Sequence, residues 1–370
     1  MTFIISYYNP SSMNGASHRL YALYNHMKNH GYEVKFVTYG EFPTSEDVIS
    51  VTYWKRLNII IFMKCVIFRM LNKIGNPIKD WQYYTNIFRL VKEHQPKNII
   101  LSYPTIDNLF LANVLSKNKN INVVFDYRDG ITSFPLEDYN FLQRLIYKKI
   151  ELKIARRDNV KITGVNKFIV PDEVENLFTE ITNFRQIQTQ RVRLILTDKS
   201  SIKFVHFGQI SNSYKRKAAY FYSAIDEMCK NYSNINFVID FYGRLSDEEK
   251  NELLKLRNKN LVISLLEPVS VDDLRKNYDV ALLLGVPGHE GYVSSKFFSY
   301  LQLNLPIFAA ADGNLVASYI KDYNIGLVGR FAPQFLNECI RLSDNKEFYT
   351  KDLRIFDEAS QCEKFAQLLN

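Results

Sequence analysis

Short apolar runs alternate with helix-like stretches along most of the 370 residues, and this alternation constrains the fold more than any other feature. Continuous apolar strands separated by helices indicate a parallel sheet that is covered on both faces. The first half therefore predicts a doubly wound α/β domain. Its expected strands are 2–6, 33–39, 98–102, 121–127 and 160–165, and its expected helices lie near 16–30, 54–74, 81–94, 106–117 and 138–158.

The same pattern restarts after an irregular stretch at about 166–200, which predicts a second doubly wound domain of similar size. We expect domains at 1–185 and 186–355, followed by a helical tail at 356–370. Ligands of such sheets bind at the carboxyl ends of the strands, so with two domains we expect the site in the cleft between them. The expected strands are 202–208, 235–243, 260–266, 279–285, 305–311 and 324–329, with helices between them, including a short one near 271–277.

Composition and missing motifs exclude several classes of protein. Hydrophobic residues make up 46% of the chain and charged residues 23%, which excludes intrinsic disorder as the main state. The four cysteines lie far apart without a CxxC or a Cys/His cluster, so we expect neither a disulfide scaffold nor a metal site. No GxGxxG or GxxxxGK[ST] occurs, which argues against a nicotinamide dehydrogenase and a P-loop NTPase. The start does not resemble a signal peptide and no run is long enough to span a bilayer, so we expect a cytoplasmic protein.

The positive charge is confined to the first half. Residues 1–165 hold 22 Lys and Arg against 13 Asp and Glu, whereas the remainder holds 25 against 26. Residues 48–79 contain no acidic residue, and basic side chains are interspersed with apolar ones from 54 to 74. This pattern predicts an interfacial helix on an anionic membrane, and the alternative is a buried helix whose lysines reach water. Nucleic acid is a less favoured partner, because no basic-aromatic motif accompanies the run.

Two loops of the first half follow strands and carry polar groups. Gly15 and His18 lie where the first loop enters a helix, whose free N–H groups suit an anion or a hydroxylated ligand. Asp126, Arg128 and Asp129 directly follow a strand. These three either bind sugar hydroxyls and move protons, or Arg128 ties the two carboxylates into a structural salt bridge.

Two loops of the second half also follow strands and carry polar or charged residues. Gly208 ends the first strand, and Lys215 and Arg216 precede a helix, an arrangement suited to a diphosphate. The segment GVPGHEGYVSSKFF, which starts at 285, is rich in glycine and projects His289 and Glu290. A serine at 294 or 295 is expected to cap the following helix.

Four segments resemble one family. SSKFFSYLQLNLPIFAAADG is similar to the "sKlfEYla.gkPviat..g" segment of retaining GT-B glycosyltransferases that build bacterial polysaccharides such as O-antigen and capsule, of the glycosyltransferase family 4 type. NPSSMNGASHRLYALYNHMKNHGYEVKFVTY resembles the family's opening, and FDYRD one of its strand-end motifs. FVHFGQIS and KRKAAYFYSAIDEM resemble the strand and diphosphate loop that open its C-terminal domain. The resemblance covers nearly the whole chain.

The resemblance implies two Rossmann-like domains that face each other across a cleft, with a C-terminal helix crossing back to the N-terminal domain. It implies an acceptor on the first domain, a nucleotide-diphosphate sugar on the second, retention of configuration, and no metal or cofactor. The residues so assigned are, as catalytic, Asp126, Asp129 and Glu290; as donor-binding, Gly208, Gln209, Lys215, Arg216, Gly243, His289, Gly291, Tyr292, Val293, Ser294, Ser295 and Ser299; and as acceptor-side, Gly15, His18 and Arg128.

Two positions depart from the family pattern. Gln209 stands where many relatives have Arg, and Ser299 stands where relatives have the Glu that grips ribose hydroxyls. The serine suggests a thymidine diphosphate sugar or a loss of donor binding. The leading hypothesis is a transferase that acts on a lipid-linked oligosaccharide at the inner face of the cytoplasmic membrane. The alternatives are a sugar-nucleotide 2-epimerase and a non-catalytic GT-B subunit.

Overall fold

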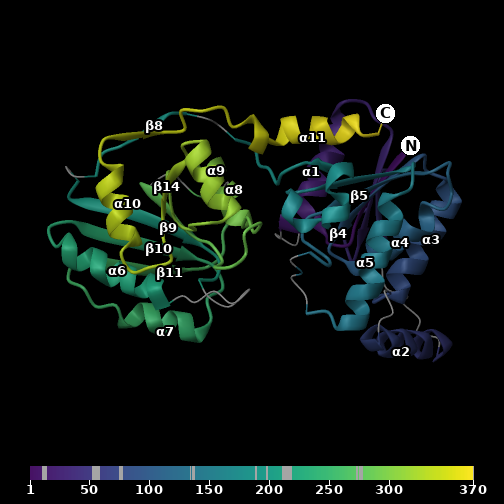
Figure 1. The fold of residues 1–370 in the computed structure, drawn as a ribbon, viewed down its shortest axis with the longest axis horizontal. Coiled ribbons are helices and arrows are strands. Elements are labelled where there is room, and N and C mark those ends of the chain that lie inside the picture. The colour runs from purple at the N-terminus through teal and green to yellow at the C-terminus, as the bar shows by residue number, and fades with distance from the viewer. Residues whose placement is uncertain are drawn as a thin grey trace. The chain divides into compact units, whose positions relative to one another are not determined.

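The chain forms two compact units in a computed structural model (Figure 1). Unit 1 comprises Met1–Asn183 and Glu358–Asn370, and unit 2 comprises Phe184–Asp357. The structure describes residues 1–10, 15–51, 59–74, 78–133, 135, 138–187, 190–196, 199–210, 219–271, 274 and 278–369.

Unit 1 contains a seven-stranded parallel sheet in the order β3-β2-β1-β4-β5-β6-β7. β1 lies between β2 and β4, so the direction in which strands are added reverses there, and such a reversal is where doubly wound sheets bind ligands. The strands are β1 Thr2–Ser6, β2 Val34–Tyr39, β3 Val48–Val51, β4 Asn98–Tyr103, β5 Asn122–Tyr127, β6 Val160–Gly164 and β7 Phe178–Glu180.

Two helices of unit 1 begin at side chains that cap them. Asp80 accepts two backbone N–H bonds at the start of α3, and Asn140 forms a capping box with Gln143 at the start of α5. α11, from the far end of the chain, packs against α1. The helices are α1 Gly15–Asn29, α2 Ile59–Ile74, α3 Trp81–His94, α4 Ile106–Leu115, α5 Phe141–Ala155 and α11 Glu358–Gln367, with 3₁₀ turns at Lys167–Ile169 and Asp172–Leu177.

Unit 2 contains a six-stranded parallel sheet in the order β11-β10-β9-β12-β13-β14, so its reversal lies between β9 and β12. A separate antiparallel pair joins β8 to β15. The strands are β8 Val192–Leu194, β9 Ser201–Phe207, β10 Asn236–Tyr242, β11 Leu261–Leu266, β12 Val280–Leu284, β13 Ile307–Ala310, β14 Gly326–Gly329 and β15 Lys346–Phe348. The helices are α6 Ala219–Asn231, α7 Asp247–Lys255, α8 Ser295–Gln302, α9 Leu315–Asp322 and α10 Phe335–Ser343, with a 3₁₀ turn at Arg354–Phe356.

The predicted pair of doubly wound domains is confirmed, and every predicted strand is present (Figure 1). The differences are short elements. β7 and β8 occupy part of the stretch expected to be irregular. β3 and β15 were not predicted, because three or four residues give no readable period, and α10, a helix of nine residues, was also missed. The expected helix near 271–277 lies largely outside the described residues, as does 52–58 at the start of the expected basic helix.

Candidate functional site

Two glycines meet at the ends of the neighbouring strands β9 and β10 of unit 2. Gly208 follows β9 with φ +68°, and Gly243 follows β10 with φ +154°. A Cβ atom on Gly243 would lie 2.6 Å from the Cα of Gly208. Glycine is therefore required at 243 by backbone packing, whatever else it does, and it brings the ends of two strands close together.

A lysine that the sequence analysis did not single out reaches this point. The side chain of Lys296, in the first turn of α8, turns back toward the end of β9. Its Nζ lies 2.7 Å from the carbonyl oxygen of Gln209 and 3.3 Å from Nε2 of His206. A Cβ atom on Gly208 would come within 3.2 Å of the Lys296 Cε. The structure thus holds a cation at the reversal of the sheet.

His206 contacts the ammonium group of Lys296 from within β9. The side chain is fully buried in β9, and its Nδ1 lies 3.0 Å from the carbonyl oxygen of Leu282 on β12. A carbonyl only accepts, so Nδ1 donates to Leu282, while Nε2 lies near both the Lys296 ammonium and, at 3.4 Å, the carbonyl oxygen of Gln209. Tyr300 also donates to Leu282, at 2.9 Å, which connects α8 to the same strand.

The loop between β12 and α8 is held in its middle and at its end. Ser294 caps α8 by accepting from the backbone N–H of Lys296, and the carbonyl of Glu290 accepts from Leu315 N at 2.7 Å. The side chain of Glu290 is exposed, whereas Gly291 is buried and the residues His289, Tyr292 and Val293 are partly buried. These hydrogen bonds therefore hold the loop backbone in place, while the Glu290 carboxylate stays available to a ligand.

Asn314 lies against the start of this loop, and its side-chain amide nitrogen makes no hydrogen bond to the described residues. Its Oδ1 caps α9 by accepting from Ala317 N at 3.2 Å, and its side chain is 6% exposed. Within the described part of the chain its Nδ2 has no hydrogen-bond partner. A Cβ atom on Gly285 would lie 2.8 Å from that nitrogen, so glycine leaves room for the amide beside the loop.

The other predicted donor residues differ in how they are placed. Ser299 is almost fully buried, and its hydroxyl donates to the carbonyl of Ser295 one turn earlier, at 3.4 Å. Ser295 is exposed at the start of α8, and Gln209 is exposed and contributes its carbonyl to Lys296. Lys215 and Arg216 lie outside the described residues.

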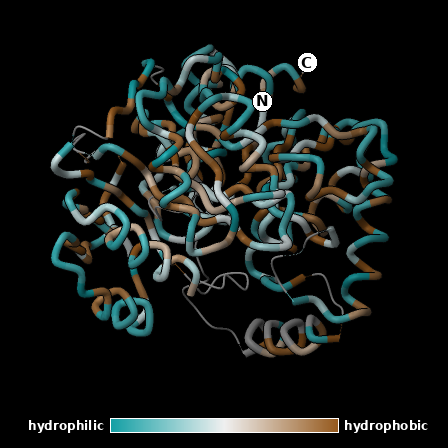
Figure 2. Tube along the Cα trace, turned by 60° about the vertical axis from the view of Figure 1, so that its left-hand side comes forward, coloured by the Kyte–Doolittle hydropathy of each residue, from teal (hydrophilic) through white to brown (hydrophobic). Residues whose placement is uncertain are grey.

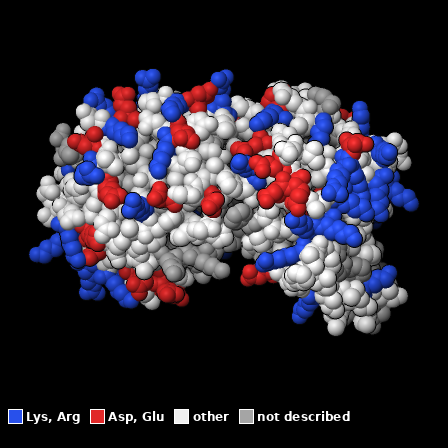
Figure 3. Space-filling view, in the orientation of Figure 1, with Lys and Arg blue, Asp and Glu red and all other residues white. Residues whose placement is uncertain are grey.

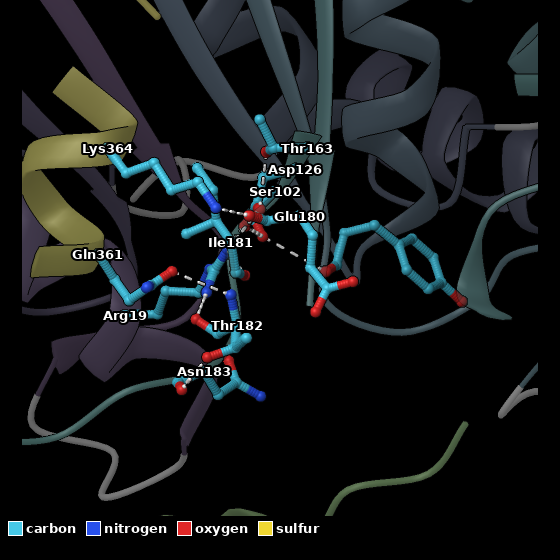
Figure 4. Close-up of polar contacts among 11 residues, drawn as sticks. Arg19, Ser102, Asp126, Thr163, Glu180, Ile181, Thr182, Asn183, Gln361 and Lys364 are labelled. Carbon is cyan, nitrogen blue, oxygen red and sulfur yellow. Dashed lines mark hydrogen bonds and ion pairs between the residues drawn. The ribbon is translucent and has the colours of Figure 1, made fainter. Parts of the chain in front are cut away.

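In unit 1, Asp126 forms a fully buried ion pair. Ser102 of β4 and Thr163 of β6 flank it in register, and their hydroxyls donate to its carboxylate at 3.1 Å and 2.9 Å. Arg19 of α1 completes the arrangement, with Nε donating to Oδ2 at 3.1 Å and Nη2 to Oδ1 at 2.9 Å (Figure 4). Four donors occupy the carboxylate, which favours a structural role for Asp126; its predicted catalytic role stays a prediction.

The same cluster holds the segment by which the chain leaves unit 1. Arg19 also donates to the carbonyls of Ile181 and Thr182, at 2.7 Å and 2.5 Å. From α11, Gln361 accepts from Thr182 N at 3.2 Å, and Lys364 donates to the carbonyl of Glu180 at 2.7 Å (Figure 4). The cluster therefore joins α1, four strands and the C-terminal helix.

Arg128 and Asp129 follow Asp126 but do not share its pairing. Asp126 pairs with Arg19, not with Arg128 as the alternative interpretation expected. Burial lowers the pKa of Arg128 and raises the pKa of Asp129, and the guanidinium partly offsets the second shift. The buried Nε of Arg128 has no hydrogen-bond partner in the described part of the chain. Nearby, Gly15 begins α1, and His18 pairs with Glu358 of α11 at 3.1 Å.

Among the described residues, no three His, Cys, Asp or Glu side chains lie together in a way that could hold a metal ion. Within the same residues, no helix has the length and apolar character needed to cross a membrane.

Solved structures resemble this chain over almost its whole length. WaaG, a glycosyltransferase involved in lipopolysaccharide biosynthesis, is 15% identical with a TM-score of 0.56, over 99% of this chain and 95% of that one. The lipopolysaccharide outer core galactosyltransferase WaaB is 11% identical with a TM-score of 0.54, over 100% and 96%. The chain has the GT-B fold. No protein-family profile and no curated protein sequence matches it.

A structure described as an enzyme of another class is similar to the same degree. A putative UDP-N-acetylglucosamine 2-epimerase from Listeria monocytogenes is 10% identical with a TM-score of 0.56, over 99% of this chain and 94% of that one. At such identities the likeness establishes the fold alone, so the activity has to be argued from the site.

Proposed function

We propose that this protein is a glycosyltransferase that moves a sugar from a nucleoside diphosphate donor, bound on unit 2, to an acceptor bound on unit 1. The observation that carries the proposal is the placement of Lys296. Its ammonium lies beside Gly208, at the reversal of the sheet, and on the first turn of a capped helix. A fixed cation next to backbone N–H groups is how proteins neutralise a diphosphate.

The donor sugar is proposed to lie against the loop between β12 and α8. The exposed carboxylate of Glu290 can accept hydrogen bonds from sugar hydroxyls, and the buried amide nitrogen of Asn314, unpaired among the described residues, lies beside the same loop. A carboxylate and an amide together can distinguish hydroxyls by direction, which is how a site of few polar groups selects one sugar.

The finer proposals follow the family resemblance. Lys296, with Lys215 and Arg216, would supply positive charge to the leaving diphosphate, so we propose a metal-independent transfer with retention and without a cofactor. The hydroxyl of Ser299 is bonded to its own helix, which supports a donor whose ribose lacks a hydroxyl, such as a dTDP-sugar. A lipid-linked oligosaccharide of bacterial surface polysaccharide synthesis, met at the inner face of an anionic cytoplasmic membrane, suits the basic first half.

A titration of nucleotides tests the proposal. Wild-type protein and Lys296→Ala are titrated by calorimetry with dTDP, UDP, GDP, ADP and CMP, with and without EDTA. We expect one diphosphate to bind regardless of EDTA, and its affinity to fall at least about tenfold in the variant because one charge-assisted contact is lost. Lys259→Ala, which removes an exposed lysine elsewhere in unit 2, should bind like wild type.

Each other result has a clear meaning. A preference for UDP would contradict the thymidine proposal alone. Failure to bind any of the nucleotides would contradict the enzyme and favour a non-catalytic subunit. If a nucleotide-sugar is converted to its epimer without any acceptor, the protein is an epimerase, the alternative that the Listeria structure keeps open.

A further inference from the structure

Helix α2 turns a stripe of large apolar side chains to solvent. Six of them are between 44% and 64% exposed, namely Ile60, Met63, Ile67, Met70, Leu71 and Ile74. At about 100° per residue these positions fall within one stripe roughly 100° wide. A helix of a globular protein normally turns such a stripe to the core, whereas α2 lies at the end of unit 1, beyond α3 and α5 (Figures 1 and 2).

The start of α5 continues the stripe. The side-chain amide of Asn140 donates to the carbonyl of Lys73 at 2.9 Å, so the end of α2 meets the beginning of α5. Phe141, Leu142 and Leu145 are 78%, 46% and 51% exposed there. We call these three residues and the six of α2 the α2–α5 face. The sequence analysis did not predict that apolar residues of α5 would extend the apolar surface of α2.

Basic side chains border the face. At about 100° per residue, Lys64 and Lys73 lie on opposite edges of the α2 stripe, and both are exposed. α5 adds the exposed residues Arg144, Lys148 and Lys149. α2 contains no acidic residue, and the only one in α5, Glu151, is fully buried. Exposed acidic residues beside α5 include Asp138, just before the helix, and Glu173, which pairs with Lys148 at 2.9 Å. Figure 3 shows uncharged surface over α2 with blue side chains at its edge.

We infer that the α2–α5 face inserts into the surface of an anionic bilayer. An apolar stripe with lysines on both edges buries its side chains among acyl chains while the ammonium groups reach anionic headgroups. A second copy is a poorer occupant, because symmetric pairing would bring basic edges against each other without acidic partners on either helix. The inference specifies the membrane contact proposed above, but it does not require the protein to transfer a sugar.

Sedimentation of the full chain with vesicles tests the inference. The vesicles contain equal parts of phosphatidylcholine and phosphatidylglycerol, and a second set contains phosphatidylcholine alone. We expect binding to the anionic set, and a loss of at least about tenfold in Ile67→Gln/Met70→Gln and in Lys64→Glu/Lys73→Glu. The matched controls Leu254→Gln/Leu342→Gln and Lys117→Glu/Lys119→Glu change exposed residues elsewhere and should bind like wild type.

Several outcomes would overturn the inference. They are an absence of wild-type binding, wild-type binding by either face variant, or an equal loss in the Lys117/Lys119 control, which would indicate attraction to net charge alone. A wild-type dimer that becomes a monomer in Ile67→Gln/Met70→Gln would make the face an interface between copies. Nucleotide titration of the same samples separates the two proposals: intact nucleotide binding without vesicle binding overturns this inference only, and the reverse overturns the enzyme only.

Discussion

Arg19 and Asp126 form a two-point hydrogen-bonded ion pair, at 3.1 Å and 2.9 Å, in the interior of unit 1. The guanidinium also donates to two backbone carbonyls of the segment that leads out of the unit. Every charge and dipole in this cluster therefore has a partner, which is the condition under which a buried ion pair is tolerated. Breaking it should act on the stability of unit 1 before it acts on any chemistry.

Replacing Asp126 by Asn should destabilise the protein strongly. Removing one partner of a buried pair leaves Arg19 uncompensated, and we expect a loss of about 3–5 kcal/mol in the free energy of unfolding. Urea titration followed by circular dichroism measures it. Arg89→Ala, which breaks the exposed pair between Arg89 and Glu93, should cost no more than about 1 kcal/mol. Normal stability with abolished turnover would instead support the catalytic assignment of Asp126.

Replacing Glu290 by Gln should reduce turnover by orders of magnitude while changing nucleotide affinity little. Its carboxylate is exposed on an anchored loop, so the variant should keep its fold and lose only contacts to the sugar. Release of nucleotide from the donor identified by titration measures turnover. Glu338→Gln removes an exposed carboxylate of α10 and serves as the matched control. Near-normal turnover in Glu290→Gln would remove this residue from the site.

Gly243→Ala should destabilise unit 2 by more than Gly313→Ala. Both positions have positive φ, which costs an alanine about 1–2 kcal/mol. A Cβ atom at 243 would in addition lie 2.6 Å from Gly208, whereas a Cβ atom at 313 would meet nothing within 4 Å. Thermal unfolding of the two variants side by side gives the difference, and equal melting temperatures would show that the ends of β9 and β10 separate easily.

The free energy of unfolding should change with pH because of Glu151. This fully buried carboxyl is bonded to Thr132, and burial raises its pKa from 4.5 to about 7. The folded state therefore holds the proton more tightly than the unfolded chain. The stabilisation is fully present below about pH 4.5 and disappears as the pH rises through about 7, a change of roughly 3 kcal/mol.

Comparison with Glu151→Gln isolates that change. The wild type should lose stability relative to the variant between about pH 4.5 and pH 7, as measured by urea titration at several pH values. Asp107→Asn offers a second, lower window, since burial raises the pKa of Asp107 from 3.8 to about 6. A difference between wild type and Glu151→Gln that does not change with pH would contradict the burial argument.

The sequence predicted the architecture well because strand period and strand length are local properties. Strands such as β5 and β9 lie within a residue of their predicted ends. The key polar contacts are not local. Lys296 bonds to Gln209 across 87 positions, and Arg19 bonds to Asp126 across 107. Arg128 is closer to Asp126 in the sequence. Arg19 is its partner in the structure because α1 packs against the sheet. The apolar side chains of α2 repeat with the period of a helix. That period is the same whether the apolar side chains face the core or the solvent, so the sequence could not decide between the two.

The route of the chain has a consequence for biosynthesis. Unit 2 is an insertion within unit 1, because α11 follows it in sequence and packs against α1. On a ribosome, unit 2 is therefore complete before the last helix of unit 1 has been made. Until then Thr182 lacks Gln361, and the carbonyl of Glu180 lacks Lys364. Unit 1, although its synthesis begins first, can complete its contacts only after all of unit 2 has been made.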